Sequence, residues 1–395
     1  MSWTTKPLAE VADFSLGKML DDKKNRGDLL PYLANINVRW GEFDLENLRE
    51  MRFEHDEMDR YGLKYGDIVM CEGGEPGRCA IWQEAVPGMM IQKALHRIRP
   101  HDCLDDRFLF YAFLHKGRNG SFAPLFTGAT IKHLPRQNLA KVEIAFPRLE
   151  LQRRIASILS TYDDLIENNR RRMALLEESA RLLYREWFVR LRFPGHEHTR
   201  IIDGLPEGWK RMTLGNLCKE IRELVLPDEI EPDTPYIGLE HMPRRSISLN
   251  EWGKAEQVTS GKHLFRAGEI LFGKIRPYFH KVGITFVDGV ASSDAIVMRP
   301  LEKKLLGLAL MTVSSDEFIA VTAQTMKEGS KMPRADWKQM QQYWVKLPPG
   351  GLLSSFDSVI QDIIEQLKTL SFTNQKLRAA RDLLLPRLMS GEIAV

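Results

Sequence analysis

Cysteine is scarce in this chain of 395 residues, and its four copies form no metal-binding pattern. Cys71, Cys79, Cys103 and Cys218 make no C-x-x-C motif, so the sequence predicts neither a zinc ribbon nor a disulfide framework. Reduced thiols of this kind are typical of the cytoplasm. Long apolar runs are absent as well: none approaches the roughly 18–20 residues of a membrane span, and the first ten residues do not resemble a signal peptide. We therefore expect a cytoplasmic protein that does not enter a membrane.

The chain also lacks a strong excess of charge, because 56 Lys and Arg face 53 Asp and Glu and leave a net charge of +3. This balance does not require a polyanionic partner, so a nucleic-acid surface would have to gather its basic residues locally. Hydrophobic residues make up 43% of the chain and charged residues 28%, which is ordinary for a folded protein and excludes wholesale disorder. At this length we expect two or three domains.

Catalytic motifs are missing too. Residues 268–275 have the spacing of a phosphate-binding loop, but Ile275 stands where Ser or Thr would bind magnesium, and the middle of the segment is an apolar strand. The glycines of residues 73–77 lack the spacing of a dinucleotide fingerprint, and no HExxH motif is present. Residues 347–350 have the double proline of an amino-methyltransferase motif without its flanking residues. The sequence therefore predicts no catalytic residue and no metal site.

The chain does contain an internal repeat, which is the first pattern to test at this length. Trp3 matches Trp209 at a separation of 206 residues, and residues 66–69 match residues 268–271 at 202. Pro147 matches Pro348 at 201, and that separation then holds to the end of the chain. A separation that drifts and then becomes constant predicts two variable globular parts, each followed by a more constrained rigid part.

The rigid parts have the pattern of a coiled-coil seam. From residue 155, and again from residue 356, apolar residues recur at alternating steps of four and three, which keeps one stripe on one helix face. If the two helices pair in antiparallel orientation, residues whose numbers add to 543 share a layer. The predicted seam residues are Ile166, Asn169, Met173, Leu176, Leu367, Leu370, Asn374 and Leu377.

This register makes specific contacts at the seam. Asn169 faces Asn374, where two amides can hydrogen-bond and define the register at some expense of stability. Tyr162 would face Arg381 in a cation–π contact, and Pro386 is expected to kink or end the second helix. Packing of each helix on its own globular half is the alternative to pairing.

Two segments rich in glycine and proline, which interrupt regular secondary structure, separate the two halves at residues 193–195 and 204–208. Strand-like runs at 67–70 and 295–298, and a helical stretch at 107–115, indicate a small mixed α/β domain in each half, so the expected fold class is α+β. The predicted divisions are a first globular domain at 1–147, a long helix at 148–192, a linker at 193–207, a second globular domain at 208–347, and a second long helix with the C-terminal tail at 348–395.

Basic residues gather beside aromatic and small polar residues at corresponding places in the two halves. Residues 262–281 carry five Lys or Arg against Glu269 as the one acidic residue. Glycine lets a backbone approach a phosphate, hydroxyl and basic groups donate hydrogen bonds there, and Arg can read guanine with two bonds. One such cluster is as often a solvated face, but paired clusters favour a binding surface. The predicted DNA-binding residues are Lys23, Lys24, Arg26, Arg78, Lys116, Arg118, Thr127, Thr130, Lys132, His133, Arg244, Arg245, Lys262, Lys274, Arg276, Tyr278, His280, Lys281, Ser330, Lys331 and Arg334.

At these residues the sequence resembles the specificity subunit of a type I restriction–modification system. The resemblance rests on residues 204–209 and 274–284, on residues 147–159, and on the C-terminal residues 384–393, and it spans essentially the whole chain. It implies two target recognition domains, each reading one half of a split, asymmetric double-stranded DNA sequence. Two long antiparallel coiled-coil helices, related by a pseudo-two-fold axis, would hold these domains apart. The Gly-Gly-Leu-Leu of residues 350–353 departs from the Leu-x-x-Gln pattern of residues 149–152, which puts the entry to the second helix in doubt.

The resemblance also implies partners. Two modification subunits would bring S-adenosylmethionine and methylate adenine, and restriction subunits would use ATP and magnesium to translocate and cut DNA. This chain would itself bind no cofactor and catalyse nothing. The alternative from another class is a helical assembly adaptor whose globular domains bind a partner other than DNA, and a third possibility is a self-sufficient methyltransferase or nuclease.

Overall fold

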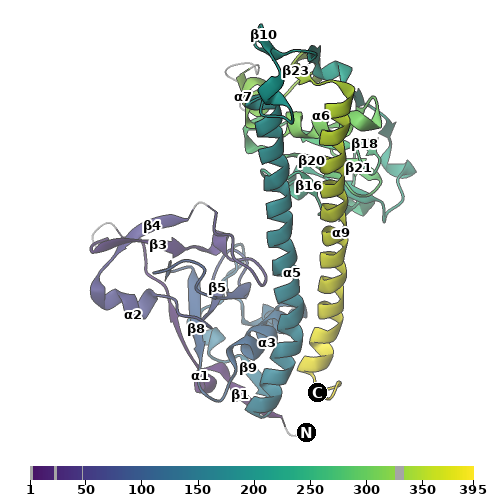
Figure 1. The fold of residues 1–395 in the computed structure, drawn as a ribbon. Coiled ribbons are helices and arrows are strands. Elements are labelled where there is room, and N and C mark those ends of the chain that lie inside the picture. The colour runs from purple at the N-terminus through teal and green to yellow at the C-terminus, as the bar shows by residue number, and fades with distance from the viewer. Residues whose placement is uncertain (1–2, 22–24, 47, 325–332) are drawn as a thin grey trace. The chain divides into compact units, whose positions relative to one another are not determined.

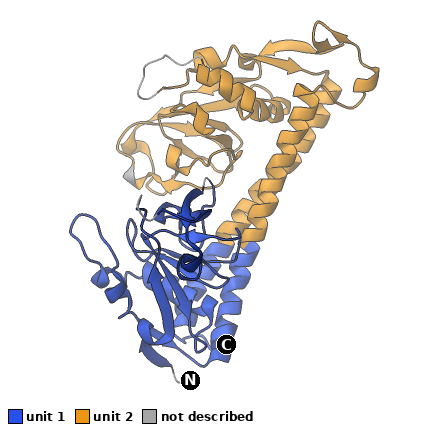
Figure 2. Cartoon of the chain, turned by 90° about the vertical axis from the view of Figure 1, so that its left-hand side faces the viewer, with its two compact units in different colours: residues 1–165, 377–395 blue, residues 166–376 orange. Residues whose placement is uncertain are grey.

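The computed structural model describes residues 3–21, 25–46, 48–324 and 333–395. The chain divides into two compact units (Figure 2). Unit 1 consists of Met1–Leu165 and Leu377–Val395, and unit 2 consists of Ile166–Lys376. Both long helices cross this division, so each unit contains the start of one helix and the end of the other.

Unit 1 contains two sheets and a separate strand pair. One sheet is antiparallel with the order β2-β8-β5-β6, and the other has the order β4-β3-β7 with β3 parallel to β7. The pair joins β1 to β9. The strands are β1 (Thr4–Pro7), β2 (Ala12–Leu16), β3 (Asp28–Leu33), β4 (Arg49–Phe53), β5 (Ile68–Cys71), β6 (Cys79–Ile81), β7 (Met90–Ile91), β8 (Leu95–Pro100) and β9 (Glu143–Phe146).

The principal helix of the globular part of unit 1 is α3 (Asp106–Arg118), which is capped by the Asp105 carboxylate accepting from the Phe108 amide at 3.0 Å. Residues 108–114 of α3 are all buried, because sheet residues lie on one side of it and the long helices on the other. Three short helices complete the unit: α1 (Leu8–Val11), α2 (Met58–Tyr61) and α4 (Arg136–Leu139).

Unit 2 has two five-stranded sheets, ordered β13-β22-β19-β20-β16 and β14-β18-β21-β15-β17. Two strand pairs, β10 with β11 and β12 with β23, lie outside these sheets. The strands are β10 (Ile201–Ile202), β11 (Leu205–Pro206), β12 (Lys210–Thr213), β13 (Cys218–Ile221), β14 (Leu224–Val225), β15 (Pro235–Ile237), β16 (Ser248–Leu249), β17 (Gly253–Lys254), β18 (Lys262–Phe265), β19 (Ile270–Gly273), β20 (Val282–Thr285), β21 (Gly289–Ala291), β22 (Ala295–Pro300) and β23 (Trp344–Leu347).

The helices of unit 2 pack on the first of these sheets. Helix α6 (Leu306–Val313) is buried over residues 307–313, and α7 (Asp316–Gln324) and α8 (Trp337–Met340) follow it. Their apolar side chains share one core with strand β19 and with residues of both long helices. Burial of this apolar surface is the main term that stabilises the unit.

The sequence repeat is also a structural repeat. Lys6 pairs with Ile144 in the β1–β9 pair, and Met212 pairs with Val345 in the β12–β23 pair, so the two registers agree at the separations of 206 and 201 residues seen in the sequence. The order β2-β8-β5-β6 recurs as β13-β22-β19-β20, with β16 added at the edge. The strand expected at 67–70 overlaps β5, which begins one residue later, and the strand expected at 295–298 and the helix expected at 107–115 lie within β22 and α3.

The long helices are α5 (Leu149–Tyr184), which ends in a π-helical turn at Arg185–Val189, and α9 (Gly350–Met389). Within each unit they run side by side (Figure 1). In unit 2 the Asn169 amide donates to the Asn374 Oδ1 at 2.9 Å, and the rings of Trp187 and Phe356 lie 5.7 Å apart. Because a later residue of α5 meets an earlier residue of α9, the helices are antiparallel.

The seam residues lie where the alternating steps of four and three predict. Asn169 and Asn374 are 7% and 4% exposed, so their mutual hydrogen bond satisfies amides that are shielded from water. Ile166, Met173, Leu367 and Leu370 are buried, and Leu176 and Leu377 are half-buried.

Packing on the globular halves accompanies the pairing rather than replacing it. Leu151 and Ile155 at the start of α5 belong to the core of unit 1, and Phe356 and Ile360 at the start of α9 belong to the core of unit 2. The two units therefore include parts of the long helices, which the predicted division at 148 and 348 sets apart from the globular domains. The reason is that the apolar stripes of the helices complete the cores of the domains.

The two helix entries use different hydrogen bonds. In unit 1 the buried Gln152 amide donates to the carbonyls of Cys103 and Pro147 and accepts from the Asp105 amide, at 2.8–3.0 Å. Leu353 occupies the matching position in α9, and one turn later the Asp357 carboxylate accepts from the Gly307 amide at 2.8 Å. Burial raises the pKa of Asp357, against the opposing effect of that amide. The second helix thus begins without the Leu-x-x-Gln pattern.

The structure departs from two local expectations, namely that Pro386 could end the second helix and that Arg381 would contact an aromatic ring. Pro386 does not end the second helix, since α9 continues to Met389 and the Pro386 carbonyl accepts from the Ser390 amide at 2.9 Å. Leu385 and Leu388 hold this last turn in the core of unit 1. Arg381 does not lie over a ring: its guanidinium pairs with the Asp163 carboxylate, which is a stronger partner than an aromatic face.

Within the described residues, no single helix is long and apolar enough to cross a membrane. Two consecutive helices, Lys303–Val313 and Asp316–Gln324, have the length and composition of a membrane span only when they are taken together, and the angle between them is 66°.

The Asn169–Asn374 pair generates a prediction for stability. Asn169→Leu should lower the free energy of unfolding by about 1–3 kcal/mol, because it leaves the buried Asn374 amide without its partner. Adding Asn374→Leu should recover most of this loss, since both polar groups are then gone. Denaturant titration of the wild type, both single variants and the double variant measures the coupling. Simply additive losses would contradict the pairing.

Candidate nucleic-acid interface

In unit 1 two loops that the sequence singles out are joined. The backbones of Thr127 and His133 exchange hydrogen bonds of 2.8 Å in both directions, which closes the loop between them. His133 also forms a bridge with Gly73, and its Nδ1 lies 3.3 Å from a carboxylate oxygen of Glu72. The closed loop at 127–133 is therefore attached to the turn at 72–78, and we call this pair the unit 1 loop site.

The side chains of the unit 1 loop site fall into two groups. Thr130 and Lys132 are exposed in the closed loop. Arg78 is 9% exposed, and its guanidinium donates to the Asn35 carbonyl at 2.9 Å and pairs with Glu75 at 2.8 Å. Arg78 therefore holds the turn in place, and its predicted contact with DNA stays a prediction.

Unit 2 repeats this construction. Ile275 forms a bridge with Arg334, the Arg276 amide donates to the Pro333 carbonyl at 3.0 Å, and the Ala335 amide donates to the Lys274 carbonyl at 2.9 Å. The segment 274–281 with residues 333–335 thus corresponds to the joined loops of unit 1, and we call it the unit 2 loop site. The strand before it, β19, is buried throughout, so residues 268–275 do not form a phosphate-binding loop.

An aromatic ring that sequence reasoning missed organises the unit 2 loop site. The guanidinium of Arg244 lies 4.2 Å from the centroid of the Phe279 ring, and that of Arg276 lies 5.8 Å from it. Tyr278 packs edge-on against the same ring at 5.0 Å and is 52% exposed. Each cation–π contact orients a charged group while leaving its donors available. The signal in the sequence was the aromatic pair that directly follows Arg276 and Pro277.

Backbone strain at the same loop accompanies this arrangement. Arg276 and His280, at the two ends of the turn, have φ angles of +49° and +56°. Residues other than glycine rarely adopt this left-handed backbone conformation, and where they do, the residue often belongs to a functional loop.

Several predicted residues of unit 2 are held inside the unit. Lys262 is 7% exposed and donates from Nζ to the Ser260 carbonyl and hydroxyl, both at 2.8 Å. The His280 ring is buried with Nε2 at 2.6 Å from the Ser314 carbonyl, and burial lowers its pKa. The ammonium groups of Lys274 and Lys281 donate to the carbonyls of Ser293 and Leu239. These contacts position the loops, and the predicted DNA contacts of the four residues stay a prediction.

The remaining predicted residues are scattered. Arg245 and Arg334 are exposed but paired, with Asp316 at 2.9 Å and Asp294 at 3.2 Å. In unit 1, Arg26 is exposed before β3, Lys116 is half-buried on α3, and Arg118 pairs with Asp382 of α9. Lys23, Lys24, Ser330 and Lys331 lie outside the described residues.

The described part of the chain contains no cluster of three or more His, Cys, Asp or Glu side chains that could hold a metal ion. The thiols of Cys71, Cys79 and Cys218 are buried, which raises their pKa and keeps them protonated, and Cys103 is exposed. The arrangement is suited to binding an anionic surface.

Residues 2–178 match the family described as type I restriction modification DNA specificity domain. The chain is 25% identical to the MjaIX specificity subunit of a type I restriction enzyme from Methanocaldococcus jannaschii, over all of this chain and 94% of that protein. It is 23% identical to the EcoDI specificity subunit from Escherichia coli, over 56% of this chain and 55% of that protein. The crystal structure of a type I restriction–modification S subunit from M. genitalium shares the fold, with a TM-score of 0.58 and 16% identity over 98% of this chain and 96% of that one.

This chain has a duplicated mixed α/β fold, with two equivalent loop sites and two long helices that complete the cores of both units. The chain is thus similar over its whole length to a type I restriction enzyme specificity subunit, and its residues 2–178 match the DNA specificity domain of that class of protein.

The closed loop of unit 1 generates a prediction. Gly128 has a φ of +96°, and a Cβ there would lie 2.1 Å from the Ile131 carbonyl oxygen, so Gly128→Ala should open the loop. Gly120 also has a positive φ, +74°, but nothing lies within 4 Å of its Cβ position, which makes Gly120→Ala the matched control. We expect amide exchange at Thr127 and His133 to accelerate about tenfold or more in Gly128→Ala alone. Unchanged protection there would contradict the role of this glycine.

Proposed function

We propose that this chain recognises a split, asymmetric double-stranded DNA sequence and that each unit reads one half. The repeated loop construction carries the proposal, because unit 1 and unit 2 join corresponding segments by corresponding backbone bridges. The side chains at corresponding positions of the turn differ, because Arg276 and Tyr278 of unit 2 stand where unit 1 has Gly74 and Pro76. Shared construction with different side chains supports two readers of different half-sites.

Two weak readers become specific when they are connected. Each correct base pair contributes about 1–3 kcal/mol of discrimination, so one short half-site is not selective against a genome. A stiff connection makes the second encounter effectively intramolecular. We assign that connection to α5 and α9, whose length would select half-sites separated by on the order of one turn of DNA.

The exposed face of α5 supports assembly with modification subunits. Leu175 and Leu182 of α5 are 69% and 45% exposed, and Val189 of the π-helical turn that follows is 42% exposed. Exposed apolar residues in one stripe on a helix favour docking of a partner helix. We propose that two modification subunits dock on the helix pair and supply S-adenosylmethionine and adenine methylation, and that restriction subunits add ATP- and magnesium-dependent cleavage. This chain would contribute no cofactor of its own.

Half-site spacing provides the principal test. The target is first identified by mapping methylated adenines in DNA of the host, and the reconstituted complex is then titrated with duplexes that differ in half-site separation. Inserting or deleting one base pair should weaken binding by about a hundredfold or more, because both readers can no longer engage together. Equal affinity across separations would contradict a rigidly connected pair of readers.

Arg276 provides a test of the unit 2 loop site. Arg276→Ala should weaken binding, and the slope of log affinity against log salt should fall by about 0.9 if the lost contact is to a phosphate. The control is Lys304→Ala, which removes an exposed cation that lies outside the loop site and pairs with Glu302 at 2.8 Å. Equal losses in both variants would show that the effect is one of net charge alone.

A further inference from the structure

The side chain of Glu177, on the long helix α5, enters the recognition part of unit 2. It is 6% exposed, and one carboxylate oxygen accepts from the hydroxyls of Ser246 and Ser248 at 2.7 and 2.6 Å. Its other oxygen lies 3.2 Å from the Arg181 guanidinium, one turn further along α5. A buried carboxylate is tolerated only with such partners, so this contact constrains both the helix and the segment 246–248.

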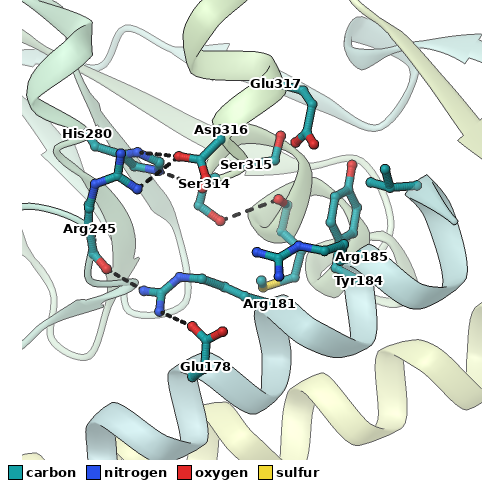
Figure 3. A pocket seen from close by; sticks show the side chains of 12 residues that line it. Glu178, Arg181, Tyr184, Arg185, Arg245, His280, Ser314, Ser315, Asp316 and Glu317 are labelled. Atoms are coloured by element: carbon teal, nitrogen blue, oxygen red, sulfur yellow. Dashed lines mark hydrogen bonds and ion pairs between the residues drawn. The ribbon is translucent and has the colours of Figure 1, made fainter.

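Arg181 extends the contact toward the loop. Its guanidinium donates to the Arg245 carbonyl, and the Arg245 amide in turn donates to the His280 carbonyl at 3.0 Å. Arg245 and the His280 ring both approach the Asp316 carboxylate, at 2.9 and 3.5 Å. These groups surround a pocket of about 230 Å³ beside α5 (Figure 3). A continuous series of polar contacts therefore runs from α5 to the C-terminal end of the turn at 276–280.

Two exposed cations, Arg244 and Arg276, lie next to the residues at which this series of polar contacts ends. Arg244 directly precedes the segment bound to α5, and its guanidinium rests on Phe279, which directly precedes His280. A shift of segment 244–248 away from α5 would move Arg244 off the Phe279 ring. The Phe279 ring, which also orients Arg276, would then lose its contact with the Arg244 guanidinium.

We propose that Glu177 and Arg181 are positioning residues for DNA recognition by unit 2: they fasten the segment 244–248 to α5 and so hold the guanidinium groups of Arg244 and Arg276 in place for the DNA. This inference rests on the proposed function, because it assigns those groups to one half-site. It adds that α5 positions the DNA-binding groups of unit 2 as well as connecting the two units.

The corresponding positions of the other long helix carry different side chains. The residues of α9 that correspond to Glu177 and Arg181 are Arg378 and Asp382, with the charges exchanged. Asp382 pairs with Arg118 at the end of α3, whereas the unit 1 loop site is closed by its own backbone bridges. The proposal therefore applies to the half-site read by unit 2 and leaves the other half-site unaffected.

The test compares discrimination at the two half-sites in the reconstituted complex. For each variant, affinity is measured for the matched duplex, for a duplex altered in the unit 1 half-site, and for one altered in the unit 2 half-site. Glu177→Gln keeps the shape of the side chain but removes its charge, and it should reduce the discrimination ratio for the unit 2 half-site about tenfold. The ratio for the unit 1 half-site should not change. Arg181→Lys, which keeps the charge but loses the planar fork, should give an intermediate loss.

Glu167→Gln is the matched control, because Glu167 lies on the same helix and pairs at 2.9 Å with Arg171 of α5. It should leave both ratios at the wild-type value. Equal loss of both ratios in Glu177→Gln would overturn the proposal and assign Glu177 to general stability. Retention of both ratios in Glu177→Gln and Arg181→Lys would also overturn it. A wild-type complex without preference for any split duplex would instead refute the proposed function.

Discussion

The apolar stripes of the two long helices are the constraint on which the rest of the structure depends. A single helix with an apolar stripe leaves that surface in water, and α5 and α9 bury theirs against each other and against the globular cores. Because each helix starts in one unit and ends in the other, neither unit has a complete core without both helices. The Asn169–Asn374 hydrogen bond selects one register among those that apolar packing alone would tolerate.

Burial divides the basic residues of the chain into two functional kinds. With a net charge of +3, the molecule as a whole has little attraction for a polyanion, so local arrangement decides where an anion could bind. Arg78, Lys262 and His280 satisfy internal carbonyls and carboxylates and thereby shape the loops. Arg276 and Lys132 remain at the surface of the loops so shaped.

The two units use one construction with different polar chemistry. Backbone bridges at equivalent positions join the loops in both, and these bridges do not depend on which side chains the loops carry. The contacts between long helix and globular part are not equivalent: Gln152 and the Asp382–Arg118 pair serve unit 1, whereas Asp357 and the Glu177 contacts serve unit 2. A duplicated scaffold can thus keep its architecture while each copy acquires a separate specificity.

The sequence by itself determined the repeat and the apolar stripe on each long helix, because alternating steps of four and three follow from helix geometry alone. It determined the register only on the condition that the helices pair in antiparallel orientation, and that orientation was decided by the structure. It also located the paired loops. It did not predict the Phe279 platform or the Glu177 contacts, since these join segments that are distant in the chain and are brought together by sheet and helix packing. The same reason explains Arg78 and Pro386: whether a charge is free, or a helix survives a proline, depends on the neighbours that the tertiary structure supplies.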